Sequence, residues 1–141
     1  MKIRQVMTSP AIRISPEESV EVAARTLARY NIGALPVCAS DGRLCGMVTD
    51  RDLVTRCLAS GGRPGQTTVK QVMTGTVVAV GPDMEAKEAA RLMGKRQIRR
   101  LPVVQNERLC GMVSLGDLID KGLQEGAADA LEGICSNISE R

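Results

Sequence analysis

Two stretches of the chain share a residue pattern that could bind the sugar and phosphate of a nucleotide. Residues 46–52 read G-M-V-T-D-R-D and residues 111–117 read G-M-V-S-L-G-D. In both, an apolar run ends on a hydroxyl residue, and an aspartate follows three positions later. Backbone amides at a helix start, together with a hydroxyl, form a small anion site. The carboxylate of Asp52 or Asp117 could accept both hydrogen bonds from the cis-diol of a ribose.

The same spacing also has a purely structural interpretation. In a capping box, a serine or threonine caps a helix start, and an acid three residues later bonds back to the amide of the cap. The spacing alone favours capping over ligand binding. However, the acid of the box is preferentially Glu or Gln, because Asp is short for that reach, and both copies here have Asp. Both interpretations stay open at this point.

The chain consists mainly of two copies of one sequence motif. The V-M-T at 6–8 returns at 72–74, 66 residues later, and the R-L-C-G-M-V at 43–48 returns at 108–113, 65 residues later. Such a duplication predicts two small units, neither of which can bury its apolar face alone, with function located between them. We divide the chain into repeat 1 (1–57), a flexible linker (58–68), repeat 2 (69–122) and a C-terminal tail (123–141) with a faint helical pattern.

Each repeat is expected to fold as strand, helix, strand, tight turn, strand, helix. In repeat 1 a short strand over 11–14 precedes Ser15 and Pro16, which are typical of a helix start. Apolar residues at helical spacing follow, and Gly33 is expected to close this helix in a left-handed conformation. Repeat 2 follows the same plan, with its first helix expected to open at 81–83.

The second half of each repeat should position the hydroxyl and the aspartate. Strands are predicted at 35–38 and 44–48, and the Asp-Gly turn between them favours antiparallel pairing. The second helix of each repeat is expected to begin at the hydroxyl residue, over 49–57 in repeat 1 and from 114 to about 123 in repeat 2. The pattern that could bind a nucleotide therefore falls where a strand gives way to a helix.

Composition excludes several classes of function. The chain of 141 residues has no histidine, the commonest general base near neutral pH and the commonest metal ligand. It also has no nucleophile elbow and no phosphate-cradling P-loop, so neither an enzyme nor a metal site is expected. With one tyrosine and no Phe or Trp, a bound purine would have to lie between aliphatic side chains. The formal charge of +3 is spread without a basic block, which argues against binding to nucleic acid or a membrane surface.

The cysteines and the N-terminal sequence point to a reducing compartment. Five cysteines without a C-x-x-C pair suggest neither a zinc cluster nor a disulfide framework, and Cys45 and Cys110 fit small buried hydrophobes. No apolar signal segment or membrane-spanning run is present, so a cytoplasmic location is expected. A thiol redox sensor using Cys57 or Cys135 is an alternative, but nothing near either residue suggests a depressed pKa.

Taken in order, the repeated motifs resemble the cystathionine-β-synthase (CBS) domain family. The V-M-T openings, the L-P-V strands at 35–37 and 101–103, and the G-x-x-[ST]-x-x-D endings occur in both copies and cover residues 3 to about 121. The chain is similar to a stand-alone tandem pair of such domains. The resemblance implies an α/β (α+β) fold, with two β-α-β-β-α repeats packed sheet to sheet about a pseudo-twofold axis. It also implies two clefts for adenosyl ligands: AMP, ADP, ATP or S-adenosylmethionine.

The resemblance also implies roles for individual residues. The two aspartates would accept the ribose hydroxyls, with Thr49 and Ser114 on the phosphate side. Family members often have a basic pair just before L-P-V; repeat 2 has Arg99 and Arg100 there, whereas repeat 1 has Gly-Ala, so unequal clefts are expected. The predicted phosphate-binding cleft combines Thr49, Asp52, Arg99 and Arg100 with aliphatic walls from Val77, Val78, Ile98 and Pro102, and Arg51 is a further candidate. The second cleft has Ser114 and Asp117.

The basic pair could instead be solvated, with its aliphatic stems covering apolar surface. The leading hypothesis is a regulatory module without catalysis that binds an adenosyl ligand and signals through conformation or dimer state to an unidentified effector protein. A homodimer is the expected assembly. The alternatives are a structural oligomerisation module with vacant clefts, or a module that binds S-adenosylmethionine.

Overall fold

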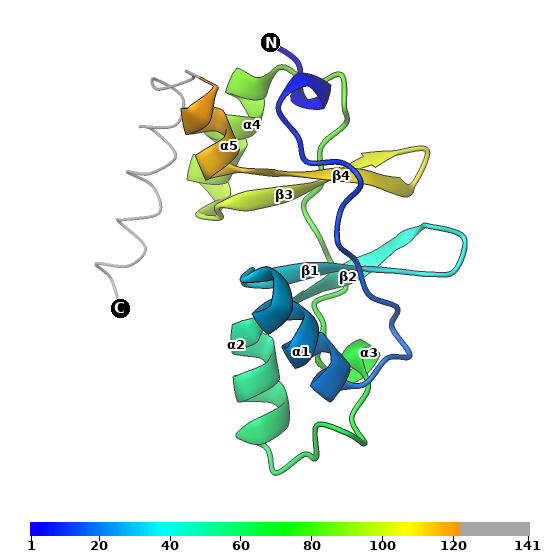
Figure 1. The fold of residues 1–141 in the computed structure, drawn as a ribbon. Helices are drawn as coiled ribbons and strands as arrows, with labels where there is room; N and C mark the ends of the chain where they lie inside the picture. The colour runs from blue at the N-terminus through cyan, green and yellow to red at the C-terminus, as the bar shows by residue number, and fades with distance from the viewer. Residues whose placement is uncertain (122–141) are drawn as a thin grey trace. The chain divides into compact units, whose positions relative to one another are not determined.

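The computed structural model describes residues 1–121, which form two compact units (Figure 1). Unit 2 is the contiguous stretch Ile12–Val77, and unit 1 combines Met1–Ala11 with the chain from Val78 onward. Each unit is a mixed α and β structure built on one two-stranded antiparallel sheet, so the predicted fold class is confirmed. The tail predicted at 123–141 lies outside the described residues.

Unit 2 has helices on either side of its strand pair in the sequence. Its elements are α1 (Val20–Tyr30), β1 (Ala34–Cys38), β2 (Leu44–Thr49), α2 (Asp50–Asp52), the π-helical turn η2 (Leu53–Leu58) and α3 (Val69–Val72). The two strands are antiparallel, with Ala34 opposite Thr49 and Cys38 opposite Leu44. The predicted strand pair and its tight turn are therefore present.

Unit 1 repeats this arrangement around its own strand pair. Its elements are the short 3-10 helix η1 (Ile3–Gln5), α4 (Ala86–Arg96), β3 (Arg100–Gln105), β4 (Arg108–Ser114) and α5 (Leu115–Asp120). Arg100 lies opposite Ser114, and Gln105 lies opposite Arg108. Figure 1 shows α4 and α5 together beside β3 and β4.

The first helix of repeat 1 begins later than the sequence predicts. It starts at Val20, where the Ser19 hydroxyl accepts the amide of Val22 at 3.1 Å, so the assignment of Ser15 and Pro16 as its start was wrong. The preceding residues 15–19 are instead bonded to residues 67–70; for example, the amide of Lys70 donates to the Pro16 carbonyl at 2.9 Å. These long-range bonds keep residues 15–19 outside α1, although the amide of Glu18 donates to the Ser15 carbonyl at 3.2 Å in a single turn.

Three other local expectations also need correction. Helix α1 ends at Tyr30 and is capped by Asn31, which has a φ of 52°, so Asn31 and not Gly33 takes the left-handed position. Helix α4 begins at Ala86, after 81–83, because the carbonyls of Pro82 and Met84 accept amides from η1. The strand predicted at 11–14 is reduced to an isolated parallel bridge at Ile14.

The V-M-T segments cross from one repeat to the strands of the other. Thr74, from repeat 2, exchanges two backbone hydrogen bonds with Met47 of β2, at 2.9 and 3.0 Å. Thr8, from repeat 1, does the same with Met112 of β4, at 2.8 and 3.0 Å. The structural units therefore differ from the sequence repeats, because each unit takes one segment from the other repeat.

Each unit has its own apolar core, and each core contains residues from both repeats. The core of unit 1 includes Ile3 and Val6 from repeat 1, beside α4, β3, β4 and α5. The core of unit 2 includes Val69 and Val72 from repeat 2, beside α1, β1 and β2. Neither repeat encloses its apolar residues by itself.

The stretch 58–68 is bonded to the start of α1. The amide of Val20 donates to the Thr67 carbonyl at 2.8 Å, and the amide of Glu21 donates to the Pro64 carbonyl at 3.0 Å. This anchoring helps to bring α3 into unit 2. Among residues 1–121 no helix has the length and apolar character needed to cross a membrane.

Candidate functional site

The G-x-x-[ST]-x-x-D segment of unit 2 forms a complete capping box. Thr49 ends β2 in an extended conformation, with φ −114° and ψ 162°. Its hydroxyl accepts the amide of Asp52 at 3.1 Å, and its own amide donates to Oδ2 of Asp52 at 2.9 Å. The structural interpretation of the spacing is therefore correct, and a shorter Asp does complete the box.

Unit 1 repeats the same geometry. The hydroxyl of Ser114 accepts the amide of Asp117 at 3.1 Å, and the amide of Ser114 donates to Oδ2 of Asp117 at 2.9 Å. Both boxes sit at the junction of a strand and the following helix, as the sequence predicts. The two copies are equivalent in their backbone bonding.

Capping occupies only one oxygen of each carboxylate. A carboxylate has two oxygens and about four lone-pair directions, so a capping aspartate retains capacity to accept further hydrogen bonds. Oδ1 of Asp52 lies 3.7 Å from Nε of Arg56, and its side chain is 13% exposed. Asp117 makes no ion pair with any residue in 1–121. Capping and ligand binding are therefore compatible roles for these aspartates.

The basic pair Arg99 and Arg100 lies beside the capping box of its own unit. The carbonyl of Arg99 accepts the amide of Leu115 at 2.7 Å, and Arg100 is paired with Ser114 across the sheet. Arg99 is exposed and Arg100 half-buried, and neither guanidinium makes an ion pair within the described part of the chain. Two positive charges without an ion-pair partner among residues 1–121 thus stand at the strand end that carries Ser114.

The corresponding place in unit 2 has the same backbone geometry without the charge. Gly33 accepts the amide of Asp50 at 3.0 Å, and Ala34 is paired with Thr49. The predicted combination of Thr49 and Asp52 with the two arginines would draw on both units, and it stays a prediction.

The predicted aliphatic wall is divided between the units. Val77 is the last residue of unit 2, whereas Val78, Ile98 and Pro102 belong to unit 1. Val78 and Ile98 are half-buried and pack against the core of unit 1, and Pro102 is buried in β3. A contact of these side chains with a purine stays a prediction.

Arg51 and Arg56 show what sequence reasoning selected and what it missed. Arg51 is exposed, and its amide donates to Oδ1 of Asp50 at 2.8 Å, while its guanidinium makes no ion pair within residues 1–121. Arg56 donates to the carbonyls of Val72 and Met73, both at 3.2 Å, in addition to its contact with Asp52. Its position four residues after Asp52 was an available sequence signal.

The cysteine and acidic side chains of residues 1–121 form no metal site. Among the described residues, no group of three or more His, Cys, Asp or Glu side chains could hold a metal ion. Cys57 is fully buried, and Cys135 lies outside the described residues. Burial raises the pKa of the Cys38 thiol, partly offset by the adjacent Arg13, and burial also raises the pKa of Cys110.

Known proteins match both the sequence and the fold. The family model described as the CBS domain matches residues 3–59 and 69–123. The CBS domain-containing protein YhcV of Bacillus subtilis is 41% identical over 133 residues, covering 94% of each chain.

Two solved structures add to this comparison. Hypoxic Response Protein I with two coordinated zinc ions is 32% identical, with a TM-score of 0.79 over 85% of this chain and 98% of the other. The CBS domain pair of the protein MJ0100, in complex with 5′-methylthioadenosine and S-adenosyl-L-methionine, is 26% identical, with a TM-score of 0.76 over 89% and 98% of the two chains.

Proposed function

The chain belongs to the CBS domain family, and we propose that it is a non-catalytic regulatory module that binds an adenosyl ligand of the AMP, ADP or ATP type. The observation that carries the proposal is the duplicated capping box, which holds each aspartate by one oxygen while the other oxygen takes no part in the box. A solved CBS domain pair with adenosyl ligands supports this ligand class. S-adenosylmethionine is the alternative ligand.

The contacts of the ligand are assigned by the family resemblance together with the charges. Asp52 accepts the ribose hydroxyls and Thr49 lies on the phosphate side, while Arg99 and Arg100 neutralise the phosphate. The absence of an ion-pair partner for either arginine within residues 1–121 supports this last role. Val77, Val78, Ile98 and Pro102 line the purine, and Arg51 is a further phosphate contact. Ser114 and Asp117 serve a second, less anionic ligand.

Substitution of Asp52 separates ligand binding from capping. Asp52→Ala should weaken AMP binding about ten-fold to a hundred-fold, because a hydrogen bond to a charged group contributes about 1.5–3 kcal/mol. Asp52→Glu retains an acid that can close the capping box but displaces the carboxylate. We expect Asp52→Glu to keep the stability of the protein and lose AMP affinity, as measured by calorimetry and urea unfolding. A fall of less than about three-fold for both variants would remove Asp52 from the site.

The phosphate role of the arginines is tested by comparing a nucleotide with its nucleoside. Arg99→Ala and Arg100→Ala should each lower AMP affinity about ten-fold and leave adenosine affinity nearly unchanged, since adenosine has no phosphate. Arg96→Ala, which removes an exposed arginine at the end of α4, is the matched control. Equal losses for AMP and adenosine would assign the pair to structure. Double-mutant cycles test which aspartate shares a ligand with the arginines. If AMP affinity showed coupling of the arginines to Asp117 and not to Asp52, the nucleotide would be assigned to the site of Asp117.

A structural oligomerisation module is the second candidate function, and exposed apolar residues favour it. Val54 and Leu58 on η2 are 54% and 55% exposed, and Ile119 at the equivalent place on α5 is 44% exposed. These helices could form a homodimer, and ligand binding could signal through that dimer to an effector protein in the cytoplasm.

Two experiments test these roles. Sedimentation should show that Val54→Glu, which places a charge on this apolar surface, has a lower molecular mass in solution than the unsubstituted dimer. A thermal-shift series with AMP, ATP and S-adenosylmethionine separates the functions, because only a binding module gains stability from a ligand.

A further inference from the structure

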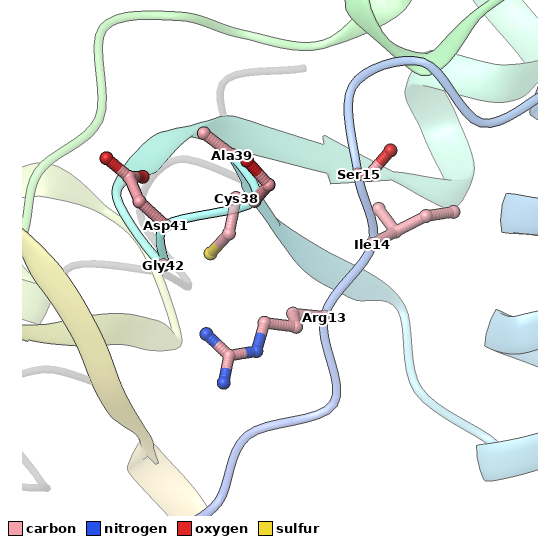
Figure 2. A pocket seen from close by; sticks show the side chains of 8 residues that line it. Arg13, Ile14, Ser15, Cys38, Ala39, Asp41 and Gly42 are labelled. Carbon is pink, nitrogen blue, oxygen red and sulfur yellow. The ribbon is translucent and has the colours of Figure 1, made fainter.

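A concave surface lies in unit 2 at the opposite end of the strand pair from Thr49. It is a cavity of about 400 Å³ between two segments, the run Arg13–Ser15 and the turn that follows β1, residues 38–42. Figure 2 shows the Arg13 side chain on one side of it and the turn with Asp41 and Gly42 on the other. Cavities of this volume are in the range that binds small molecules. Because all its residues belong to unit 2, the cavity exists within a single unit.

Backbone hydrogen bonds fix the position of Arg13 at this cavity. The next residue, Ile14, donates its amide to Pro36 at 3.1 Å and accepts the amide of Cys38 at 2.9 Å. Figure 2 shows the side chain of Arg13 near the sulfur of Cys38, and the guanidinium partly offsets the rise that burial causes in the pKa of that thiol. Arg13 makes no ion pair with any residue in 1–121. A thiol is a weak acceptor, so the guanidinium has a charge and donors to offer a ligand.

The carboxylates near the cavity already have partners. Oδ2 of Asp41 lies 3.3 Å from Nε of Arg43, and Oδ1 accepts the amide of Arg43 at 3.1 Å. Glu17, beside the cavity residue Ser15, accepts the Ser15 hydroxyl at 3.1 Å. The negative charge of Asp41 is thus offset by Arg43, whereas no carboxylate of residues 1–121 forms an ion pair with Arg13.

A second hollow in unit 2 brings further arginines near Arg13. It is lined by Arg13 itself together with Arg25 and Arg29 of α1. Arg25 is paired with Glu21 at 2.7 Å, whereas Arg29 lies over the ring of Tyr30, 5.5 Å from its centroid. Arg29, like Arg13, makes no ion pair with any residue in 1–121, and this local positive charge favours an anion in the adjacent cavity.

We propose that this cavity binds a small organic anion through a carboxylate or phosphate group held by Arg13. The site is independent of the proposed adenosyl site, because it shares no residue with it. Unit 1 has Ala79 and Val104 at the positions equivalent to Arg13 and Cys38, so it lacks both the guanidinium and the thiol. The same comparison shows that alanine and valine fit this scaffold, which makes Arg13→Ala and Cys38→Val suitable test substitutions.

Titration of the full chain with succinate and with inorganic phosphate tests the proposal and distinguishes the two anion classes. At constant pH and ionic strength, NMR of the ¹⁵N-labelled protein should show saturable shifts at the amides of residues 38–42 and at Nε of Arg13. Arg13→Ala should weaken the binding about ten-fold or more. Arg96→Ala removes an equal charge from unit 1 and should leave the affinity unchanged. Shifts that do not saturate for either anion, or equal affinity in Arg13→Ala, would overturn the proposal.

The thiol at the cavity gives a second measurement that does not depend on a chosen ligand. Iodoacetate is anionic and iodoacetamide neutral, and both alkylate the thiolate: an S–C bond forms, iodide leaves, and the thiol proton goes to solvent. The ratio of their rates at Cys38 cancels the thiolate fraction, so it reports how strongly the cavity favours an anion. Arg13→Ala should lower the iodoacetate-to-iodoacetamide ratio at Cys38 several-fold and leave it unchanged at Cys110. An unchanged ratio at Cys38 would contradict anion recruitment, and if Cys38 resists both reagents the titration alone decides.

Discussion

Units 1 and 2 share their strand pairing and their capping boxes, but they differ in which equivalent positions at the two ends of the strand pair carry arginine. In unit 1, Arg99 and Arg100 stand at the end that carries the capping serine. In unit 2 that end has Gly33 and Ala34, and Arg13 stands at the far end, beside the turn. The backbone scaffold is duplicated, whereas the positive charge is not. The side chains that differ between equivalent positions are therefore the ones that give each unit its own chemistry.

The largest expected effect is a difference in stability between a fragment that follows a structural unit and a fragment that follows a sequence repeat. Val69 and Val72 are 0% and 1% exposed in the core of unit 2, although both belong to repeat 2. A fragment 12–77 retains them, whereas a fragment 1–66 loses them together with the pairing of Thr74 to β2. Burial of the two valines alone contributes about 3–6 kcal/mol. We expect 12–77 to unfold cooperatively in urea and 1–66 to be largely unfolded, as measured by circular dichroism.

Fragment 1–66 differs from 12–77 in two ways, because it lacks residues 67–77 and contains residues 1–11. Fragment 12–66 lacks both stretches, so if the loss of 67–77 is the cause, it should be as unfolded as 1–66. If 1–66 were as stable as 12–77, the exchanged segments would contribute little, and the repeats would be the true folding units.

The exchanged segments also explain the glycines that open the two G-x-x-[ST]-x-x-D patterns. A Cβ on Gly46 would lie 2.5 Å from the carbonyl oxygen of Thr74, whereas a Cβ on Gly111 would lie 2.7 Å from Sδ of Met7 and 2.9 Å from the carbonyl oxygen of Thr8. The backbone clash is therefore less severe at Gly111, where the shortest contact is with a methionine side chain that can move. We expect Gly46→Ala to cost about 2–3 kcal/mol and Gly111→Ala about 1–2 kcal/mol in the free energy of unfolding.

Gly75→Ala is the matched control for this pair, because a Cβ there would meet nothing within 4 Å. Its cost should be close to zero, since alanine also restricts the unfolded chain. Urea unfolding of the three variants measures the order. Equal costs for Gly46→Ala and Gly75→Ala would mean that the V-M-T segment of repeat 2 does not lie against β2.

Local patterns predicted the elements that depend only on neighbouring residues. The strand pair follows from its apolar run and its Asp-Gly turn, and both capping boxes follow from the hydroxyl and the aspartate three residues later. The resemblance then supplied the ligand class. These features are set by bonds that span a few residues, so a sequence window contains what is needed to predict them.

Features that depend on distant segments were beyond that window. Ser15 and Pro16 read as a helix start, but the bond from Lys70 to Pro16 delays the helix to Val20. The exchange of V-M-T segments was likewise invisible, because identical motifs in both repeats do not say which strand each one joins. The only sequence signal for the site at Arg13 was a difference between the repeats, because Arg13 is matched by Ala79 in repeat 2.

The smallest expected effect is that of a substitution at Arg56, whose side chain connects η2 with the end of α3. Its guanidinium donates to the carbonyls of Val72 and Met73 at 3.2 Å, and it lies 3.7 Å from Asp52. Arg56→Lys keeps the charge but cannot supply a planar set of donors to several acceptors at once. Because the side chain is half exposed, we expect the free energy of unfolding to fall by only about 0.5–1 kcal/mol.

Unit 1 provides the reciprocal substitution for this test. Lys121 stands at the position equivalent to Arg56, and it is exposed at the end of α5. Lys121→Arg should therefore leave stability in urea nearly unchanged, whereas Arg56→Lys lowers it. If both substitutions had the same effect, the two carbonyl contacts of Arg56 would contribute nothing beyond its charge. Unequal effects would show that the second helix of unit 2, unlike that of unit 1, is joined by its own side chain to a segment of the other repeat.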